Sequence, residues 1–530
     1  MSFSKTFKRQ FTARRLLFYL IWHGVHAALF VWGWYSQKSN DQLAILNLLT
    51  YSVWISRGAG LCLVLDGALI FLPVCRKTIS FLRPKLTWLM PLNEVHTTAH
   101  YRNMYLVEAT QVRPNTAVGI MYTETGPLTG HIMLLIMVLM ATTAHWRVRR
   151  QCFEAFWYTH QLAFFWAIAF FSHASGCFVR GALPGAEVKC IGYNGIYYEI
   201  FGGVLYFSER VWREIAARRQ TRITSVLLHP SGTVELRFQK PSFKYVPGQW
   251  LFLQMPEVSR FQWHPFTISS APDEPHISLH MRQVGDFTRA VGQRLGATPK
   301  LAKQLDSMVK PGVKGQDART TGFVDISSVR NIRLPTIRID GPHGAPAEDV
   351  FKFQFAVLIG AGIGVTPFSS ILKNIYFKYQ RGELHRLRKV HFIWLNKEPA
   401  SFGWFRDVLR GLEESIQEPD FLQMDMYLTG HLDTDTVMNV TLNSAKSQYD
   451  ALTGLEAGTH FGRPDWKRDV FEPAKNTVNS FSALEGEEKS RKVGVFFCGP
   501  SDLGRVLKTH CKEIKSSNCS FEFYKEHCET

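Results

Sequence analysis

Long apolar stretches, separated by short basic clusters, fill the first 215 residues of the chain. Five of them approach the ~20 residues that a helix needs to cross a bilayer: residues 16–34, 54–72, 128–144, 153–171 and 193–207. The first is too long for the apolar core of a signal peptide and has no obvious small-residue cleavage site, which favours a spanning helix. The pattern predicts an α-helical transmembrane domain over residues 1–215.

The pattern changes after the fifth stretch. Short alternating runs, such as residues 233–238, are typical of antiparallel strands. From Phe355 onward, apolar strands alternate with helical segments, as in a parallel α/β sheet. We therefore expect a six-stranded antiparallel β-barrel over residues 221–346 and an α/β domain over residues 347–530. The polar stretch 476–492 is expected to be a loop of the α/β domain.

The formal net charge is +17, and the basic residues of the first half gather at the ends of the apolar stretches. The clusters lie at residues 5–15, 76–85, 147–150 and 213–222. Because Lys and Arg resist translocation, the clusters predict cytoplasmic loops, and they place the C-terminal half in the cytosol. Nucleic-acid binding is disfavoured, since no basic stripe interleaves with exposed aromatic residues.

The same clusters expose a missing membrane crossing. Only one apolar stretch, residues 128–144, lies between the clusters at 76–85 and 147–150. The segment 88–107 cannot supply another, because it contains a proline, histidines and charged residues that are costly near mid-bilayer. A chain that starts and ends on one side crosses an even number of times. Five crossings therefore predict that a spanning helix is missing near residue 94.

The nine cysteines follow no CxxC or disulfide-dense spacing, so neither a zinc site nor a stapled secreted fold is expected. Cys177 and Cys190 pair if their loop faces an oxidising compartment, and otherwise they are two free thiols. Both alternatives stay open on the sequence alone.

A glycine-rich turn carries the strongest chemical signal. Residues 360–367 read Gly-Ala-Gly-Ile-Gly-Val-Thr-Pro and directly follow the apolar run 355–359. Such a turn between strand and helix lets backbone N–H groups and the helix N-terminus meet a pyrophosphate. An ordinary strand–helix loop is the alternative, but the strand, the helix and the proline all fall where a nucleotide site needs them.

Two further motifs lie on either side of the glycine-rich turn in the sequence. Residues 264–270 and 280–288 set hydroxyls beside an aromatic ring and then an arginine, which suits a flavin ring and its diphosphate. Residues 495–500 form a strand that ends in a cysteine and a turn, a place for a nicotinamide to dock. In this order the motifs resemble the ferredoxin-reductase fold of flavin dehydrogenases. With the membrane half, the chain resembles the NADPH oxidase family, closest to its fungal members, and residues 340–350 and 462–465 strengthen the match.

The resemblance implies a transmembrane electron path. Electrons would pass from NADPH to FAD, then through an inner and an outer b-type haem, to molecular oxygen on the far side, which gives superoxide. It also implies an integral protein of the plasma membrane or an internal membrane, with a small GTPase and a cytosolic activator subunit as partners. A ferric-chelate reductase uses the same haem and flavin plan and is the first alternative.

The resemblance carries over to individual residues. FAD would be held by His264, Pro265, Phe266, Thr267, Arg282 and Thr288. NADPH would be held by Gly360, Gly362, Thr366, Pro367, Cys498 and Gly499, with Cys498 also a catalytic residue. Lys397 and Arg463 fall where the family places cations for the 2′-phosphate, whereas an NAD enzyme would have a carboxylate on the ribose. Arg57 and His100 match family residues near the oxygen-reducing site.

Haem ligation is implied for His96, His160 and His173. His160 and His173 share one apolar stretch and stand thirteen residues apart, ~20 Å along a helix. A bend between them is required to turn both toward one haem channel. His96 matches the second of two family histidines on another helix, and the first, expected near residue 82, is absent. His96 and His173 would therefore pair at the outer haem, and His160 would lack a partner at the inner haem.

Two departures from the family predict impaired activity. Most of the third spanning helix is missing, so a truncated form that is inactive in transmembrane transfer is the second alternative. At the C-terminus, Cys528 stands where the family has an aromatic residue that shields the flavin, and two residues are added. The stacking position of the nicotinamide is therefore expected to be altered.

Overall fold

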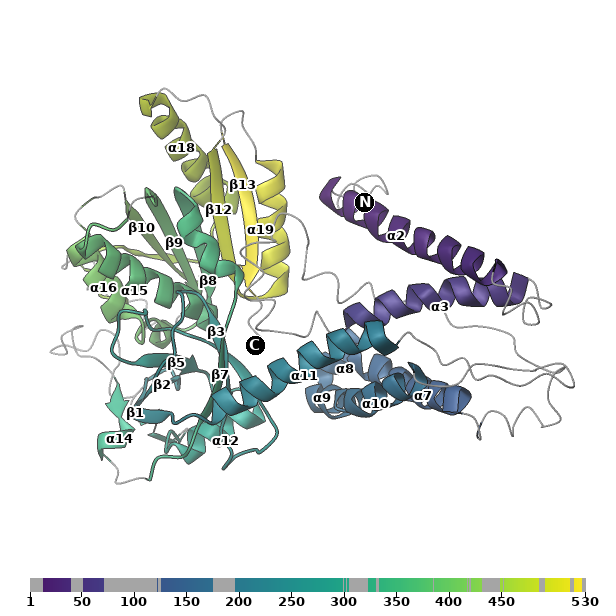
Figure 1. The fold of residues 1–530 in the computed structure, drawn as a ribbon. Coiled ribbons are helices and arrows are strands. Elements are labelled where there is room, and N and C mark those ends of the chain that lie inside the picture. The colour runs from purple at the N-terminus through teal and green to yellow at the C-terminus, as the bar shows by residue number, and fades with distance from the viewer. Residues whose placement is uncertain are drawn as a thin grey trace, which may run out of the picture. The chain divides into compact units, whose positions relative to one another are not determined.

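The computed structural model describes residues 13–39, 51–70, 122, 125–174, 196–298, 300–301, 303–304, 323–329, 333–384, 386–416, 418, 421–430, 449–450, 452–485, 491–514 and 519–526 (Figure 1). The chain divides into two compact units, Met1–Trp212 and Arg213–Thr530, and each is described by itself. The catalytically relevant motifs of the C-terminal half therefore fall within one unit.

The first unit is helical. Its elements are α2 (Ala13–Lys38), α3 (Tyr51–Ile70), α7 (Thr125–Ala144), α8 (Trp146–Gln151), α9 (Phe153–His160), α10 (Ala163–Ala174) and the first part of α11 (Ile196–Arg218). α2 lies against α3 through glycines: a Cβ on Gly33 would come within 2.8 Å of the Arg57 carbonyl oxygen, and one on Gly58 within 2.7 Å of the Phe30 carbonyl oxygen. Small residues of this kind let helices approach closely in membranes.

One of the five expected spans, residues 153–171, is not a single helix. α9 ends at His160 and α10 begins at Ala163, whereas the other four stretches overlap α2, α3, α7 and α11. At the break the Gln161 N–H donates to the Tyr158 carbonyl (3.2 Å) and the Leu162 N–H to the Thr159 carbonyl (3.1 Å). These bonds have the three-residue spacing of a tightened helix end. The helix is therefore interrupted between His160 and His173, and the orientation of both rings toward one haem channel stays a prediction.

Large apolar side chains point outward along these helices. Leu20 and Trp32 of α2 are 68% and 67% exposed, and Phe201 of α11 is 69% exposed. Exposed apolar surface of this kind marks contact with lipid or with another protein. Within the described ranges, one helix is long and apolar enough to cross a membrane, Leu17–Lys38, and the apolar segment Leu128–Ala144 is shorter.

The second unit begins with an antiparallel β-domain. Its strands are β1 (Arg222–Leu228), β2 (Val234–Gln239), β3 (Trp250–Gln254), β4 (His264–Thr267), β5 (Ile277–Met281), β6 (Val324–Asp325) and β7 (Arg338–His343). They form the sheets β5-β2-β1-β6 and β4-β3-β7, which a bridge between Ile268 and Leu279 connects. Both sheets pack around one core that includes Leu228, Phe238 and Leu251.

The expected antiparallel β-domain is thus confirmed, but the count of six strands is wrong. The described part of the domain has seven, because β6 is only two residues long and too short to show an alternating pattern. One helix, α12 (Asp286–Arg294), follows β5 and buries Phe287 and Val291.

The rest of the second unit is a parallel α/β domain. Its strands are β8 (Phe355–Ala361), β9 (Lys389–Asn396), β10 (Leu422–Leu428), β11 (Thr459–Phe461), β12 (Arg491–Cys498) and β13 (Cys519–Glu526), in the order β11-β10-β9-β8-β12-β13. Each neighbouring pair is parallel. Parallel strands require crossover connections, and the described crossovers are helical.

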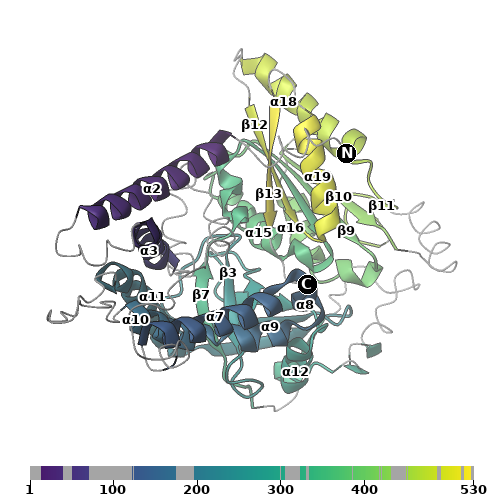
Figure 2. The same cartoon turned by 90° about the vertical axis from the view of Figure 1, so that its right-hand side faces the viewer.

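Helices cover both faces of this sheet (Figure 1, Figure 2). α15 (Thr366–Gln380) and α16 (Arg406–Ser415) share one core with Ala356 and Leu358 of β8. α18 (Glu472–Glu485) and α19 (Ser501–Glu513) share another with Phe355, Val357 and Ile359. Alternate residues of β8 thus face opposite helix layers, which explains why the strand is apolar throughout. The expected loop at 476–492 is wrong at both ends, because α18 continues to Glu485 and β12 begins at Arg491.

Candidate functional site

The carboxyl ends of two neighbouring parallel strands bring the glycine-rich turn and Cys498 together. β8 and β12 pair with Gly360 opposite Cys498. The sheet order places β9, β10 and β11 on one side of β8, and β12 and β13 on the other, so the chain changes direction between β8 and β12. In open α/β sheets, ligands bind in the crevice outside the carboxyl ends of the strands at this switch point.

The glycine turn is tightly built. Gly362 has a φ of +57°, a left-handed conformation that suits glycine, and it starts the 3₁₀ turn η5 (Gly362–Val365). A Cβ on Gly364 would come within 2.6 Å of the Cys498 carbonyl oxygen. Only glycine therefore lets the turn approach the end of β12, and α15 begins directly after the turn.

The residues expected to hold NADPH lie around this crevice. They are Gly360, Gly362, Thr366, Pro367, Cys498 and Gly499. Thr366 and Pro367 open α15, whose N-terminal N–H groups and dipole favour a phosphate. A Cβ on Gly499 would come within 2.8 Å of the Ala361 Cβ, so the two strand ends touch. Cys498 is buried and disulfide-bonded, so its sulfur is not a free thiol in this structure.

Lys397 and Arg463 lie at the same edge of the sheet. Lys397 follows the last residue of β9, and Arg463 comes two residues after β11, with β10 between the two strands. Leu428 of β10 pairs with both Asn396 and Phe461, which puts the ends of β9 and β11 about two strand spacings apart, roughly 10 Å across the sheet. Both side chains are exposed. Two exposed cations at this edge suit the extra phosphate of NADPH.

His264 is the most distinctive residue of the expected flavin site. With Pro265, Phe266 and Thr267 it forms β4, which is half-buried and pairs with β3. The His264 ring stacks on Phe287 at 3.8 Å between centroids and 16° between planes. Burial lowers the pKa of His264 to about 4, so the ring is neutral at pH 7. Its Nε2 atom is buried and has no hydrogen-bond partner among the described residues.

A buried polar atom without a partner costs about 1–3 kcal/mol, so His264 fits a bound polar ligand such as FAD. Arg282 directly follows β5 and is exposed, so it can reach a diphosphate. Thr288 has a different visible role. Its Oγ1 accepts from the Gly285 N–H and donates to the Gly285 carbonyl, both at 3.0 Å, which closes the first turn of α12.

Sequence reasoning missed the residues that join the flavin domain to α15. Ser369 Oγ donates to the Ser269 carbonyl (3.1 Å), and Ser370 Oγ donates to the Ser270 carbonyl (2.6 Å). Lys373 pairs with Glu274 at 3.1 Å. These bonds tie the segment after β4 to the helix that follows the glycine turn. Two adjacent serines followed by an apolar run at the start of a helix were the available signal.

The expected haem and oxygen-site residues lie in the first unit. The His173 Nδ1 is 3.0 Å from the Thr129 Oγ1 of α7, which leaves Nε2 as the ring nitrogen for a metal. His160 is the last residue of α9 and is half-buried. Arg57 is half-buried in α3. His96, His100 and the cysteines Cys177, Cys190 and Cys528 lie outside the described residues. His160 and His173 thus lie on two successive helices, and their role as haem ligands stays a prediction.

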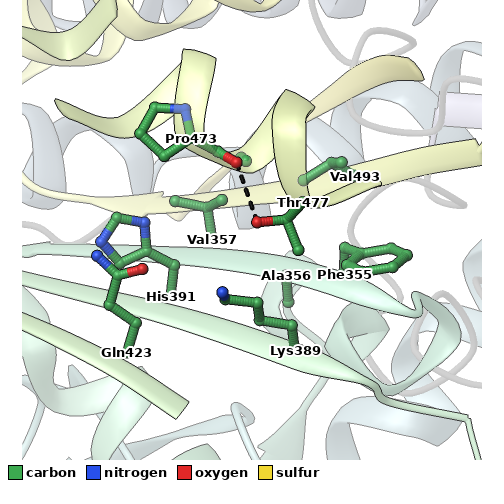
Figure 3. Close-up of a pocket in the computed structure, with 10 residues that line it drawn as sticks. Phe355, Ala356, Val357, Lys389, His391, Gln423, Pro473, Thr477 and Val493 are labelled. Carbon is green, nitrogen blue, oxygen red and sulfur yellow. Dashed lines mark hydrogen bonds between the residues drawn. The ribbon is translucent and has the colours of Figure 1, made fainter. Parts of the chain in front are cut away.

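A small pocket lies at the opposite edge of the sheet. It is lined by Phe355, Lys389 and Val493, near the starts of β8, β9 and β12, and by Thr477 of α18 (Figure 3). Thr477 Oγ1 donates to the Pro473 carbonyl at 3.0 Å within the helix. No residue of the expected sites lines this pocket.

The fold and the crevice define a flavin dehydrogenase of the ferredoxin-reductase type. Residues 218–347 match the family model of an FAD-binding domain, and residues 353–512 match that of the ferric reductase NAD binding domain.

Relatives extend over nearly the whole chain. NADPH oxidase 1 of Mus musculus is 30% identical, covering 96% of this chain and 93% of the mouse protein. A superoxide-generating NADPH oxidase heavy chain of Dictyostelium discoideum is 33% identical (91% and 90%). NADPH oxidase 3 of Homo sapiens is 29% identical (94% and 95%). The chain belongs to the NADPH oxidase family. The expected closeness to fungal members stays a prediction.

The alignment lengths bear on the expected missing segment. The alignment with the mouse protein runs over 595 positions, more than the 530 residues of this chain. The mouse protein therefore carries residues that this chain lacks. The missing third spanning helix stays a prediction.

Proposed function

We propose that this chain is an NADPH-dependent flavoprotein oxidoreductase that delivers electrons to molecular oxygen and forms superoxide. The observation that carries the proposal is the pairing of Gly360 with Cys498 at the switch point of the sheet, in a member of the NADPH oxidase family. Bound FAD would supply the chemistry, because a flavin accepts two electrons as one hydride and releases them one at a time.

The residues around the crevice bind and orient the two nucleotides. The N-terminus of α15 and the glycine turn would meet the NADPH pyrophosphate, while Lys397 and Arg463 would pair with the 2′-phosphate. β4 and the N-terminal region of α12 would hold FAD. The bonds from Ser369, Ser370 and Lys373 to the flavin domain fix the distance between the two sites.

The membrane half is proposed to carry b-type haems beside α9 and α10. His160 and His173 would ligate iron from one side, and His96 would oppose His173. Arg57 and His100 would lie near the site where oxygen is reduced. The protein is proposed to lie in the plasma membrane or an internal membrane with the flavin domain in the cytosol. Binding of a small GTPase and of a cytosolic activator stays a prediction.

The test separates superoxide formation from ferric reduction. Membranes that contain the full chain are supplied with NADPH, and superoxide-dismutase-sensitive reduction of cytochrome c is compared with reduction of a ferric chelate. If the protein is an oxidase, superoxide dismutase is expected to remove most of the cytochrome c reduction. Reduction of the ferric chelate at an equal or higher rate, insensitive to dismutase, would favour the ferric-chelate reductase. Flavin reduction by NADPH without either product would identify an impaired membrane half.

A further inference from the structure

Three metal-binding side chains converge inside the flavin domain, away from the residues expected to hold FAD. His229 follows the last residue of β1, Glu235 lies on β2 and His280 lies on β5. Glu235 and His280 are direct partners in the β2–β5 ladder. The three residues are only 5%, 4% and 7% exposed. Within the described residues they form a group of potential ligand atoms that lie within 4.8 Å of one another.

The distances suit a tetrahedral metal ion. The Glu235 Oε2 lies 3.4 Å from the His229 Nε2 and 3.7 Å from the His280 Nε2. Zinc binds imidazole nitrogen and carboxylate oxygen at about 2.0–2.1 Å, so two ligand atoms of a tetrahedral site lie roughly 3.3–3.4 Å apart. Both distances to the Glu235 Oε2 are therefore within about 0.4 Å of this spacing, and the two imidazole nitrogens lie within 4.8 Å of each other.

Hydrogen-bonding groups surround the Nδ1 side of the His280 ring. Ser269 Oγ lies 2.7 Å from the His280 Nδ1, 2.9 Å from the Ser278 Oγ and 3.0 Å from the Ser278 carbonyl oxygen. With Nδ1 held by Ser269, the Nε2 atom is the ring nitrogen on the Glu235 side, 3.7 Å from Oε2. A metal-bound histidine is commonly held in this way by its other nitrogen.

His229 supplies an independent indication. Its Nε2 is buried and has no hydrogen-bond partner in the described part of the chain, although it faces the Glu235 carboxylate. Arg237 orients that carboxylate from the other side, with its Nε 2.6 Å from Oε1 and its Nη2 3.2 Å from Oε2. The Nε2 atoms of His229 and His280 thus both lie near the buried Glu235 Oε2, which also accepts from the Arg237 Nη2.

We propose that His229, Glu235 and His280 bind a zinc ion, with water as the fourth ligand. The ion would fasten the end of β1 to β2 and β5. It would also fix the His280 ring, which packs on Trp404 of the α/β domain at 4.1 Å between centroids. The site is structural, since its carboxylate and imidazoles are buried. It stands independently of the proposed oxidase activity.

The test measures zinc in the full-length protein with its FAD, purified without metal-affinity chromatography and dialysed against a weak chelator. Mass spectrometry of the metal content is expected to give about one zinc ion per chain. His229→Gln is expected to lower bound zinc at least ~10-fold, because one of three protein ligands is lost. His276→Gln, which changes a histidine of the same domain outside the cluster, is the matched control and keeps its zinc. Flavin absorbance and unfolding temperature report whether each variant folds.

A second measurement needs no variant. A strong chelator is expected to lower the unfolding temperature of the unsubstituted protein, and added zinc is expected to restore it. Less than about a tenth of an ion per chain after incubation with zinc would overturn the proposal and identify a buried ion pair neutralised by Arg237. Full retention of zinc by folded His229→Gln would overturn it as well, since the ion would then lie elsewhere.

Discussion

Gly364 and Cys498 touch across two neighbouring strand ends: a Cβ on the glycine would lie 2.6 Å from the cysteine carbonyl oxygen and 3.2 Å from its sulfur. The contact sets how closely the nucleotide-binding turn approaches the end of β12. It therefore links the phosphate end of the NADPH site to the end where the nicotinamide is expected. A substitution at either residue is therefore expected to affect both ends of the NADPH site.

Gly364→Ala is expected to lower the rate of flavin reduction by NADPH at least ~10-fold, because the added methyl group must push the turn away from β12. Single-turnover flavin reduction measures the effect, with flavin content as a check on folding. Gly411→Ala in α16 is the matched control, since nothing lies within 4 Å of its Cβ. An unchanged rate in Gly364→Ala would show that the turn can move without affecting the nucleotide.

Asp340→Asn is expected to destabilise the second unit by about 3–5 kcal/mol, because it leaves Arg213 buried without its counter-charge. The Arg213 Nε lies 3.2 and 3.1 Å from the two Asp340 oxygens, and the side chains are 4% and 8% exposed. Burial would raise the pKa of Asp340, but His343 and Arg213 hold it well below its usual value.

Denaturant unfolding of the flavin domain measures this loss. Asp286→Asn is the control, because Asp286 is 91% exposed and pairs with Arg289 at the surface, where a pair contributes about 0–1 kcal/mol. Similar losses in the two variants would contradict the importance of the buried pair.

Stability is expected to fall as the pH drops from about 6.5 toward 4. The pKa of His264 is lowered by burial to about 4 in the folded protein, against about 6.5 for an unperturbed histidine. The unfolded chain therefore binds more protons in this window, so the free energy of unfolding rises with pH across it. Unfolding midpoints at pH 5 and 7 measure the change, and His264→Gln should reduce the difference. An identical pH dependence in the variant would contradict the assignment.

Much of the catalytic half could be predicted from sequence because its signals are local. The glycine turn, β4 and the strand that ends at Cys498 each lie in one short run of residues, and the alternation of strands and helices indicated the parallel sheet. The zinc cluster could not be predicted, since His229, Glu235 and His280 meet only through the pairing of β1, β2 and β5. The same holds for Ser369 and Ser370, whose partners lie 100 residues away.

In the membrane half, the sequence indicated that the helix must be interrupted between His160 and His173, but it did not show at which residue. Helical periodicity showed that His160 and His173 point apart on a straight helix. It did not show that the backbone N–H groups of Gln161 and Leu162 donate to carbonyls three residues earlier in the chain. The polar residues 159–161 are followed at once by an apolar run from Leu162, so the stretch looked like one span.

The protein is expected to bind at most one haem per chain, because His160 lacks a family partner and a spanning segment is predicted to be missing. Pyridine haemochrome assay of the unmodified protein measures the count. Insertion of about seventeen residues, with a histidine roughly fourteen positions (~20 Å) before His96, should restore a second haem and transfer across the membrane. Two haems in the unmodified chain would mean that another residue ligates the inner iron.

NADPH specificity is the central claim, and anaerobic stopped-flow reduction of the bound flavin tests it most directly. The full-length protein is mixed with NADPH or NADH, and the flavin absorbance is followed over one turnover. NADPH is expected to be favoured ~10-fold or more, since each charge-assisted bond contributes about 1.5–3 kcal/mol. Arg463→Ala should remove most of the preference, whereas Lys492→Ala, a cation paired with Glu522, should retain it. Equal rates with the two nucleotides, or an unchanged preference in Arg463→Ala, would contradict the account.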